Sequence, residues 1–457
     1  MGSTPAYARA MHALGMLARN QGNTKLARTS LEQARQVYSQ LGDRSGEASS
    51  FSNLGSLARD QSDYEDAHVC YEKALEIHRE IGNKNGESAD LIGLGLVAME
   101  QGDFIAAHAY YERSLEISHE IGNRHGEAIA LNNLGTVAKE QGDNGTARSY
   151  YGQSLEICRE LGIMLGEALN LGNLGDVARE QSEYTTARDY YEQALLINRE
   201  IGNREGEASN LNTMGLVALS QGDYALAHSY FDRALAITRE IGNQAWGAII
   251  LNNLGEVALA RSDSASARSY YEQALAIHHE LGNRSWEAMD LNGLGHVALH
   301  QSEYTMARSH YERALAIARE IGDRSKQAES LWGLGRTMGY QKESRQAGSC
   351  LKQALHIQQK LGQKKEAATS LEALAELCAR QGQAVRAARL LGMAHALRMH
   401  IHAPLPPNAQ AAYECVLTTL RSALSEDSFN FAWERAGDDP GAGHRLRPGS
   451  AGRNLIC

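Results

Sequence analysis

Apolar residues along the chain form short helical stripes that are separated by polar turns. In one segment, residues 141–143 (Gln-Gly-Asp) divide two stripes whose members are spaced by three, four or more residues. The stripe residues are Ala128, Leu131, Leu134 and Ala138 before the turn, and Ala147, Tyr151, Leu155 and Leu161 after it. Spacing of this kind places apolar side chains on one face of a helix. The pattern therefore predicts a helical hairpin.

The hairpin pattern recurs with a step of 40 residues and without insertion or deletion. Its marker is a Leu-Gly pair in the first helix, found at 54–55, 94–95, 134–135, 174–175, 254–255, 294–295 and 334–335, with Met-Gly at 214–215. Leu14-Gly15 and Leu374-Ala375 extend the series at its two ends. A constant period of this length indicates an array of stacked repeats. We expect ten units between Ala6 and Ala403.

Glycine and asparagine mark the ends of the predicted helices. Gly162 stands where a glycine that ends a helix belongs. In most units an Asn or Asp follows this glycine and can cap the next helix. These residues are Asn83, Asn123, Asn203, Asn243, Asn283 and Asp323.

The glycine inside the first helix requires a different explanation, because it costs about 1 kcal/mol relative to alanine. Close approach of the paired helix would leave no room for a side chain and would explain its recurrence. We expect small residues on the second helix to form the other side of this contact. They are Ala67, Ala107, Ala147, Ala187, Ala227, Ala267 and Ala307.

At these positions the sequence resembles the tetratricopeptide repeat family. One unit carries the pattern at Leu94, Gly95, Gly102, Asp103, Phe104, Ala107 and Tyr111. The 40-residue period is similar to the longer repeats of Pins-type scaffold proteins and of many bacterial signalling proteins. The resemblance covers about six-sevenths of the chain, although the unit at 326–365 lacks the Gly-Asp-Tyr turn. It implies an all-α, right-handed superhelical solenoid of about ten hairpins with C-terminal capping helices.

The C-terminal segment resembles the region that closes the repeat array in large bacterial regulators. Such regulators carry an N-terminal ATPase module, which this sequence lacks, so we expect only their repeat arm. The predicted domains are a solenoid at 6–403, capping helices at 404–435 and a disordered tail at 436–457. Synonymous codons for residues 436–449 can be chosen that encode a helix resembling the family's ending when read one base later. Our hypothesis is a frameshift; the alternative is an ordinary flexible tail.

Composition narrows the classes of partner. The net charge of −10 and the isoelectric point near 6.0 argue against direct binding to nucleic acid or to an anionic membrane. No run of eighteen apolar residues and no signal peptide is present, and the six cysteines are dispersed. We expect a cytoplasmic protein. No proline occurs between Ala6 and Ala403, which favours helices.

The sequence contains short matches to nucleotide-binding and metal-binding motifs, but the helical repeat explains them more simply than such a function does. Residues 93–98 match a dinucleotide-binding pattern, but they lie in the middle of a predicted helix rather than after a strand. His296 and His300 are four residues apart and could reach one metal ion, yet no third ligand is evident and surface histidines are the favoured interpretation. We therefore expect no catalytic residue, no metal site and no cofactor.

The resemblance implies that the first helix of each unit lines a concave groove. Asparagine recurs just before the Leu-Gly pair although it is a mediocre helix former. Structural bonding between repeats and an amide ladder that binds a peptide backbone both remain open as its role. Basic residues also recur four positions after the glycine in the N-terminal half, and leucines replace them in the C-terminal half. The candidate groove residues are Asn53, Asn132, Asn133, Asn173, Asn212, Asn252, Asn253, Asn292, Arg59, Lys139 and Arg179.

These observations predict a non-catalytic scaffold that binds a protein or an extended peptide. The resemblance suggests a role in bacterial signalling or transcriptional regulation. The alternative is a ligand-sensing regulator, or an enzyme, that uses the groove for a small molecule.

Overall fold

The computed structural model describes residues 4–401, 403, 405 and 407–438. Every regular element within these residues is an α-helix. The first ten helices are α1 (Pro5–Asn20), α2 (Thr24–Leu41), α3 (Arg44–Asp60), α4 (Tyr64–Glu80), α5 (Lys84–Glu100), α6 (Phe104–Glu120), α7 (Arg124–Glu140), α8 (Asn144–Leu161), α9 (Met164–Glu180) and α10 (Tyr184–Glu200). The next six are α11 (Arg204–Ser220), α12 (Tyr224–Glu240), α13 (Gln244–Ala260), α14 (Ser264–Glu280), α15 (Arg284–His300) and α16 (Tyr304–Glu320). The last six are α17 (Arg324–Tyr340), α18 (Ser344–Lys360), α19 (Lys364–Arg380), α20 (Ala384–His400), α21 (Pro407–Ala423) and α22 (Glu426–Asp438).

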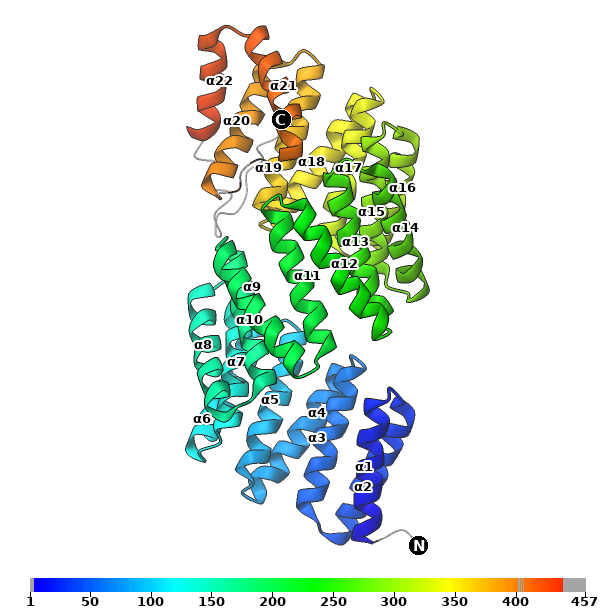
Figure 1. Cartoon of the computed structure of the whole chain (residues 1–457), viewed down its shortest axis with the longest axis vertical. Helices are drawn as coiled ribbons and strands as arrows, with labels where there is room; N and C mark the ends of the chain where they lie inside the picture. The colour runs from blue at the N-terminus through cyan, green and yellow to red at the C-terminus, as the bar shows by residue number, and fades with distance from the viewer. Residues whose placement is uncertain (1–3, 402, 404, 406, 439–457) are drawn as a thin grey trace. The chain divides into compact units, whose positions relative to one another are not determined.

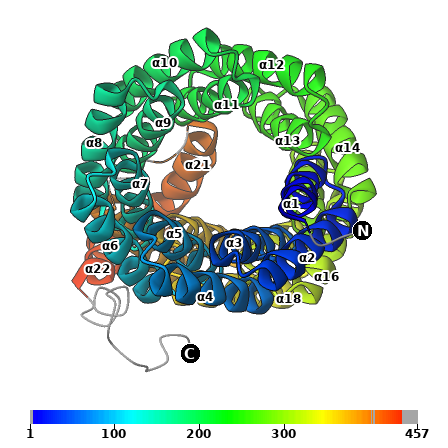
Figure 2. The same cartoon turned by 90° about the horizontal axis from the view of Figure 1, so that it is seen from below.

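The chain forms two compact units, which are described separately. Unit 1 comprises residues 1–210 and unit 2 residues 211–457, so the division falls within α11. In both units an odd-numbered helix and the even-numbered helix after it form a hairpin, and each hairpin stacks on the next (Figure 1). The odd-numbered helices of the repeats lie on the inner side of each stack and the even-numbered ones on the outer side (Figure 2). The prediction of an all-α array of hairpins is confirmed.

The helix boundaries follow from the capping residues. The Asn123 side chain accepts a hydrogen bond of 2.9 Å from the backbone N–H of Gly126 and so caps α7. Gly162 ends α8 in the left-handed conformation, at a φ of 67°. Lys342 adopts a φ of 66° in the turn between α17 and α18, where the equivalent turns have glycine or serine. This hairpin therefore forms without the Gly-Asp-Tyr turn.

The glycine of the repeat pair in α3, α5, α7, α9, α11, α13 and α15 makes room for an aromatic ring, not for the small residues that we expected, whereas Gly15 and Gly335 face Leu31 and Leu351. A Cβ atom on Gly135 would lie 2.7 Å from the ring of Tyr151 on α8. Ala147 is buried one turn earlier on α8, but the aromatic side chain fills the space beside the glycine. Equivalent rings pack against Gly55, Gly95, Gly175, Gly215, Gly255 and Gly295. The expectation of close approach was right, and the expected partner was wrong.

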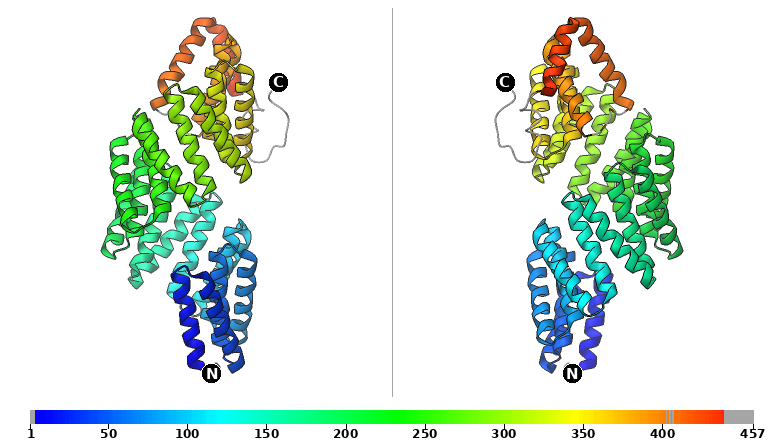
Figure 3. Two further views of the ribbon diagram at one scale, coloured as in Figure 1. Left: turned by 90° about the vertical axis from the view of Figure 1, so that its right-hand side faces the viewer. Right: turned by 90° about the vertical axis from the view of Figure 1, so that its left-hand side faces the viewer.

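Two helices follow the last hairpin. The residues Phe429 and Ala432 of α22 are buried against Leu391 of α20 at the end of unit 2, drawn in orange and red in Figure 3. Helix α21 instead lies on the inner side (Figure 2). Because α22 ends at Asp438, residues 436–438 of the predicted tail are helical. Residues 439–457, and with them the frameshift hypothesis, lie outside the described residues.

Candidate functional site

Most of the candidate asparagines are bonded to neighbouring hairpins. The Asn132 amide on α7 donates a hydrogen bond of 2.9 Å to Asn170 on α9. Further bonds of this kind join Asn53 to His12 (3.1 Å), Asn253 to Asn212 (2.9 Å), Asn252 to Asp290 (2.7 Å) and Ser330 to Asn292 (2.8 Å). For these residues the structure supplies a role in joining repeats.

Asn133 and Asn173 differ from the others. Both side chains are partly exposed at the same position of adjacent repeats, and neither has a hydrogen-bond partner among the described residues. Three large apolar side chains lie at nearby positions of α7 and α9: Ile129, Leu165 and Leu169, which are 40%, 59% and 56% exposed. Unit 1 thus combines two available amides with an exposed apolar surface. We call these five residues the α7–α9 surface.

The candidate cations are paired with carboxylates. Arg59 lies 3.9 Å from Glu100 on the next inner helix, and Lys139 lies 3.9 Å from Asp176. Arg179 is 4.0 Å from the same Asp176 carboxylate. Acidic side chains at neighbouring positions therefore offset the charge of these three cations. Their use as partner-binding groups stays a prediction.

Tyrosine hydroxyls reach the inner face of unit 1 and bond to it. The ring that packs against the glycine places its hydroxyl beside the residue that follows that glycine. Tyr71 bonds to Ser56 at 2.8 Å, and Tyr151 donates to Thr136 at 3.1 Å. Tyr191 donates to Asp176 at 2.7 Å. In these three hairpins the tyrosine hydroxyl is hydrogen-bonded to a residue of the same hairpin.

The inner face of unit 2 contains a cluster of buried polar atoms without partners. His296 replaces the hydroxyl or carboxylate residue of unit 1, and its ring lies 5.7 Å from Tyr311 and 5.6 Å from Trp332 between ring centroids. His296 Nε2, the Tyr311 hydroxyl and Trp332 Nε1 are all buried, with no hydrogen-bond partner among the described residues, and the Asn292 amide bonds the Glu329 carboxylate. Arg336 lies over the Trp332 ring at 5.1 Å. We call the first four residues the unit 2 cluster.

Burial shifts the pKa values of groups in and near the unit 2 cluster. Burial and the Arg336 guanidinium lower the pKa of His296 to about 4. Burial raises the pKa of Glu329, on the adjacent helix, to about 7, although the Asn292 amide opposes the rise. Burial also raises the pKa of the Tyr311 hydroxyl well above its usual range. These groups are therefore neutral in part or in full near neutral pH.

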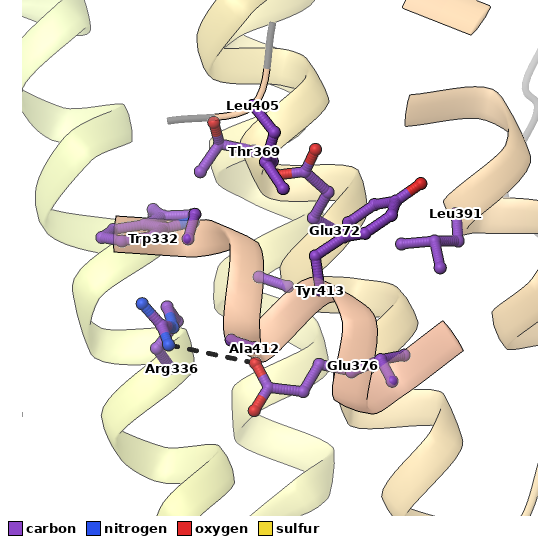
Figure 4. A pocket seen from close by; sticks show the side chains of 12 residues that line it. Trp332, Arg336, Thr369, Glu372, Glu376, Leu391, Leu405, Ala412 and Tyr413 are labelled. Carbon is purple, nitrogen blue, oxygen red and sulfur yellow. Dashed lines mark ion pairs between the residues drawn. The ribbon is translucent and has the colours of Figure 1, made fainter. Parts of the chain in front are cut away.

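A pocket of about 90 Å³ adjoins the cluster where α21 crosses α17 and α19 (Figure 4). Trp332 and Arg336 line one side, and Arg336 is paired with Glu376 at 3.9 Å. Tyr413 of α21 projects into the pocket from the other side (Figure 4). Part of the inner face of unit 2 is thus covered by the chain's own helix.

Sequence analysis missed one Ser/Asp/His contact. Asp90 accepts from Ser52 at 2.6 Å and bonds His78 Nδ1 at 2.6 Å, with both Asp90 and His78 buried. The hydroxyl bonds to the carboxylate and not to the imidazole, so the geometry does not activate Ser52 as a nucleophile. The arrangement recurs in unit 2 with His278 and Asp290. These contacts join consecutive hairpins.

The signal for the unit 2 cluster was present in the sequence as a departure from the repeat. Trp332 stands at a position where four other units have asparagine, and His296 and Arg336 stand at the position of Ser56, Thr136 and Asp176 in unit 1. His300, the other member of the proposed metal pair, contacts Ser264 at 3.2 Å. In the described part of the chain, no three His, Cys, Asp or Glu side chains are arranged to hold a metal ion. Nor does any described helix combine the length and apolar character needed to cross a bilayer.

Solved structures and a family model match the chain, whereas no curated protein sequence does. The aspartyl phosphate phosphatase F structure from Bacillus subtilis is 12% identical, with a TM-score of 0.54, and the match covers 78% of this chain and 94% of that one. A signal transduction ATPase with numerous domains and a tetratricopeptide repeat sensor, from Pyrococcus horikoshii, is 16% identical, with a TM-score of 0.53. That match covers 79% of this chain and 54% of the ATPase. At such identities the similarity shows the fold alone.

The family model gives the assignment. The model described as tetratricopeptide repeat matches residues 7–80, 87–160, 166–240, 212–280 and 286–360. These segments span most of the ten hairpins. The chain therefore belongs to the tetratricopeptide repeat family.

Proposed function

We propose that the chain is a non-catalytic scaffold that binds an extended peptide segment of a partner protein on the α7–α9 surface. The observation that carries the proposal is the pair of available amides on Asn133 and Asn173, because the other candidate asparagines with resolved contacts are bonded within the chain. An amide has both a donor and an acceptor and can bond one peptide group of an extended strand. The partner is a cytoplasmic protein in a bacterial signalling or transcriptional pathway.

The spacing of the two amides suits an extended chain. Helices α7 and α9 are neighbours, as the bonds from Asn132 to Asn170 and from Lys139 to Asp176 show. Packed helices lie about 8–10 Å apart, which is about three residues of extended polypeptide. Asn133 and Asn173 can therefore bond peptide groups about three residues apart. Ile129, Leu165 and Leu169 then contact apolar side chains of the same segment.

A displayed peptide library provides the test. Peptides selected on the wild-type protein should bind the Asn133→Ala/Asn173→Ala variant about 5- to 150-fold more weakly, because two hydrogen bonds worth about 0.5–1.5 kcal/mol each are lost. Fluorescence anisotropy with a labelled selected peptide measures this change. The thermal stability of the variant should stay close to that of the wild type, since neither amide is bonded within the chain.

Asn132→Ala is the matched control, because Asn132 is adjacent in sequence and bonded to Asn170. It should lower stability and leave peptide affinity nearly unchanged. Equal peptide affinity of the wild type and the double variant would overturn the proposal, and so would a large loss of stability in the double variant.

The unit 2 cluster supports a second candidate function, the binding of a small molecule that carries hydrogen-bond acceptors. Trp332 Nε1 is an unpartnered donor, and Arg336 adds a cation beside it. A thermal-shift screen of small carboxylates and amides on the wild type and on Trp332→Phe tests this candidate. A ligand should raise the melting temperature of the wild type only. Equal shifts in both proteins would argue against the site.

A further inference from the structure

A second pocket, of about 490 Å³, lies in unit 1 between the outer helices α2 and α4, with α3 on its inner side (Figure 2). Its walls include Arg28 and Arg35 of α2, Phe51 of α3, and Cys70 and Lys73 of α4. We call these five residues the α2–α4 pocket. Its volume falls within the range of about 300–1,000 Å³ that is usual for small-molecule sites.

The next hairpins show which side chains normally fill this space. Two leucines and a tyrosine from three successive helices pack into one cluster there: Leu75, Leu91 and Tyr110. The same set recurs in the following two grooves, as Leu115, Leu131 and Tyr150 and as Leu155, Leu171 and Tyr190. A tyrosine ring from an outer helix therefore closes each of these grooves.

The α2–α4 pocket lacks this tyrosine ring. Forty residues before Tyr110 the chain has Cys70, whose much shorter side chain is 8% exposed. Arg35 stands at a position that leucine holds in the eight hairpins that follow, and an arginine keeps its charged end in water where a leucine packs into the core. Phe51 replaces the other leucine, and its ring stays partly exposed. The missing ring leaves the groove open.

Two cations of the pocket have no carboxylate partner. The Arg35 guanidinium lies 5.0 Å and the Lys73 ammonium 5.6 Å from the centroid of the phenylalanine ring on α3. Neither forms an ion pair within the described part of the chain, whereas Arg28 is paired with Asp66 at 2.8 Å. Glu32 is the other carboxylate that lines the pocket. Three cations thus face two carboxylates, and the remaining positive charge favours an anionic ligand.

The Cys70 thiol lines the pocket as a small neutral group. Burial, together with the nearby Asp66 carboxylate, raises the pKa of this thiol to about 11. The nucleophilic form of cysteine is the thiolate, which is scarce near neutral pH at such a pKa. A ligand of this pocket is therefore held without a covalent bond.

We propose that the α2–α4 pocket binds a small aromatic carboxylate. The ring of the ligand takes the space that a tyrosine ring fills in the following grooves, beside Phe51 and Cys70. Its carboxylate accepts hydrogen bonds from Arg35 and Lys73, and the fork of a guanidinium matches the two oxygens of a carboxylate. The pocket shares no residue with the α7–α9 surface, so this function is independent of peptide binding.

Isothermal titration calorimetry of the full chain with phenylacetate tests the proposal. Phenylacetamide has the same ring without the charge and should bind at least about tenfold more weakly, because hydrogen bonds to a charged group are lost. Acetate lacks the ring and should also bind at least about tenfold more weakly. Arg35→Leu, which introduces the residue of the other grooves, should weaken phenylacetate binding about 10- to 150-fold. Absence of phenylacetate binding to the wild type overturns the proposal, and so does equal affinity for phenylacetamide.

Cys70→Tyr supplies the ring that the other grooves have and should block the pocket. The variant should bind phenylacetate at least about tenfold more weakly, because the ligand ring is no longer buried. Cys350→Tyr is the matched control, since Cys350 has the same repeat position on α18, outside the pocket, and this variant should bind like the wild type. Circular dichroism checks that both variants are folded, and Arg35→Leu tests the site if Cys70→Tyr is not. Undiminished binding by folded Cys70→Tyr overturns the proposal, as does loss of binding by folded Cys350→Tyr.

Discussion

At equivalent positions, the inner face of unit 1 bonds a tyrosine hydroxyl and the inner face of unit 2 leaves one without a bond. In unit 1, Thr136 accepts the hydroxyl of Tyr151, and Lys139 is paired with Asp176. In unit 2, His296 leaves the hydroxyl of Tyr311 without a partner. Leu299 stands there at the position that Lys139 has in unit 1. The scaffold determines where a tyrosine hydroxyl emerges, and one neighbouring residue determines whether that hydroxyl is bonded within the chain.

The largest effect concerns a feature that both units share. Gly135→Leu and Gly295→Leu should each lower the free energy of unfolding by about 1–3 kcal/mol or more, because the new side chain overlaps a tyrosine ring. The loss should be larger for Gly295, because Gly333 closes the other side of the Tyr311 ring. Denaturant unfolding measures both. Gly152→Leu, on an open face of α8, should not destabilise the protein, and parent-like stability of Gly135→Leu would show that the ring can move.

The second prediction concerns a substitution that leaves a tyrosine hydroxyl of unit 1 without a partner, like that of Tyr311 in unit 2. Thr136→Val keeps the side-chain shape but removes the acceptor of the Tyr151 hydroxyl. Leaving a buried hydroxyl unpaired should cost about 1–3 kcal/mol in denaturant unfolding. His296→Thr should do the reverse in unit 2 and add up to about 1 kcal/mol. Opposite signs for the two variants would support the comparison, and equal signs would break it.

The third prediction concerns the dependence of stability on pH that Glu329 produces in unit 2. The pKa of Glu329 is raised from 4.5 to about 7, so the native state holds this proton more tightly than the unfolded chain does. Stability should therefore fall as the pH rises from 4.5 through 7. Glu329→Gln should remove that fall, and melting curves between pH 5 and 8 measure it.

His296 on α15 provides a control, because its effect on the pH dependence of stability has the opposite sign. The pKa of His296 is lowered from 6.5 to about 4, so its contribution to stability is lost as the pH falls through that interval. His296→Thr should reduce the loss below pH 6.5 and leave the slope of stability against pH unchanged above it. Identical pH profiles for the wild type and Glu329→Gln would mean that the Glu329 carboxyl is well solvated.

The smallest effect is expected at the paired cations of unit 1. Lys139→Leu introduces the residue type of unit 2 at the same position, and the ion pair that it removes is partly exposed. Such pairs contribute about 0–1 kcal/mol. The melting temperature should hardly change, while its dependence on salt should weaken. A loss well above 1 kcal/mol would show that the pair with Asp176 is structurally important.

Periodicity in the sequence was sufficient to predict the hairpins, their caps and the presence of close contacts at the glycines. It could not identify the group that meets each glycine, because alanine and tyrosine on the second helix are four residues apart and share one face. Nor could it separate Asn132 from Asn133. A step of one residue turns a side chain by about 100° around the helix, and only the stacking of α9 shows that one amide is bonded and the other is available.

The sequence pattern could not predict the proximity of the residues of the unit 2 cluster either. His296 and Trp332 come from different hairpins, and Tyr311 lies on the outer helix between them. Their proximity depends on how successive hairpins stack. The path of α21 across the inner face follows from tertiary contacts of Tyr413 and its neighbours and has no periodic signal.

The contacts of each hairpin with its immediate neighbours also have a kinetic consequence. Since the contacts that bury Tyr151, or any equivalent ring, join residues close in sequence, the contact order of the chain is low. Folding can begin at any hairpin and spread to the next.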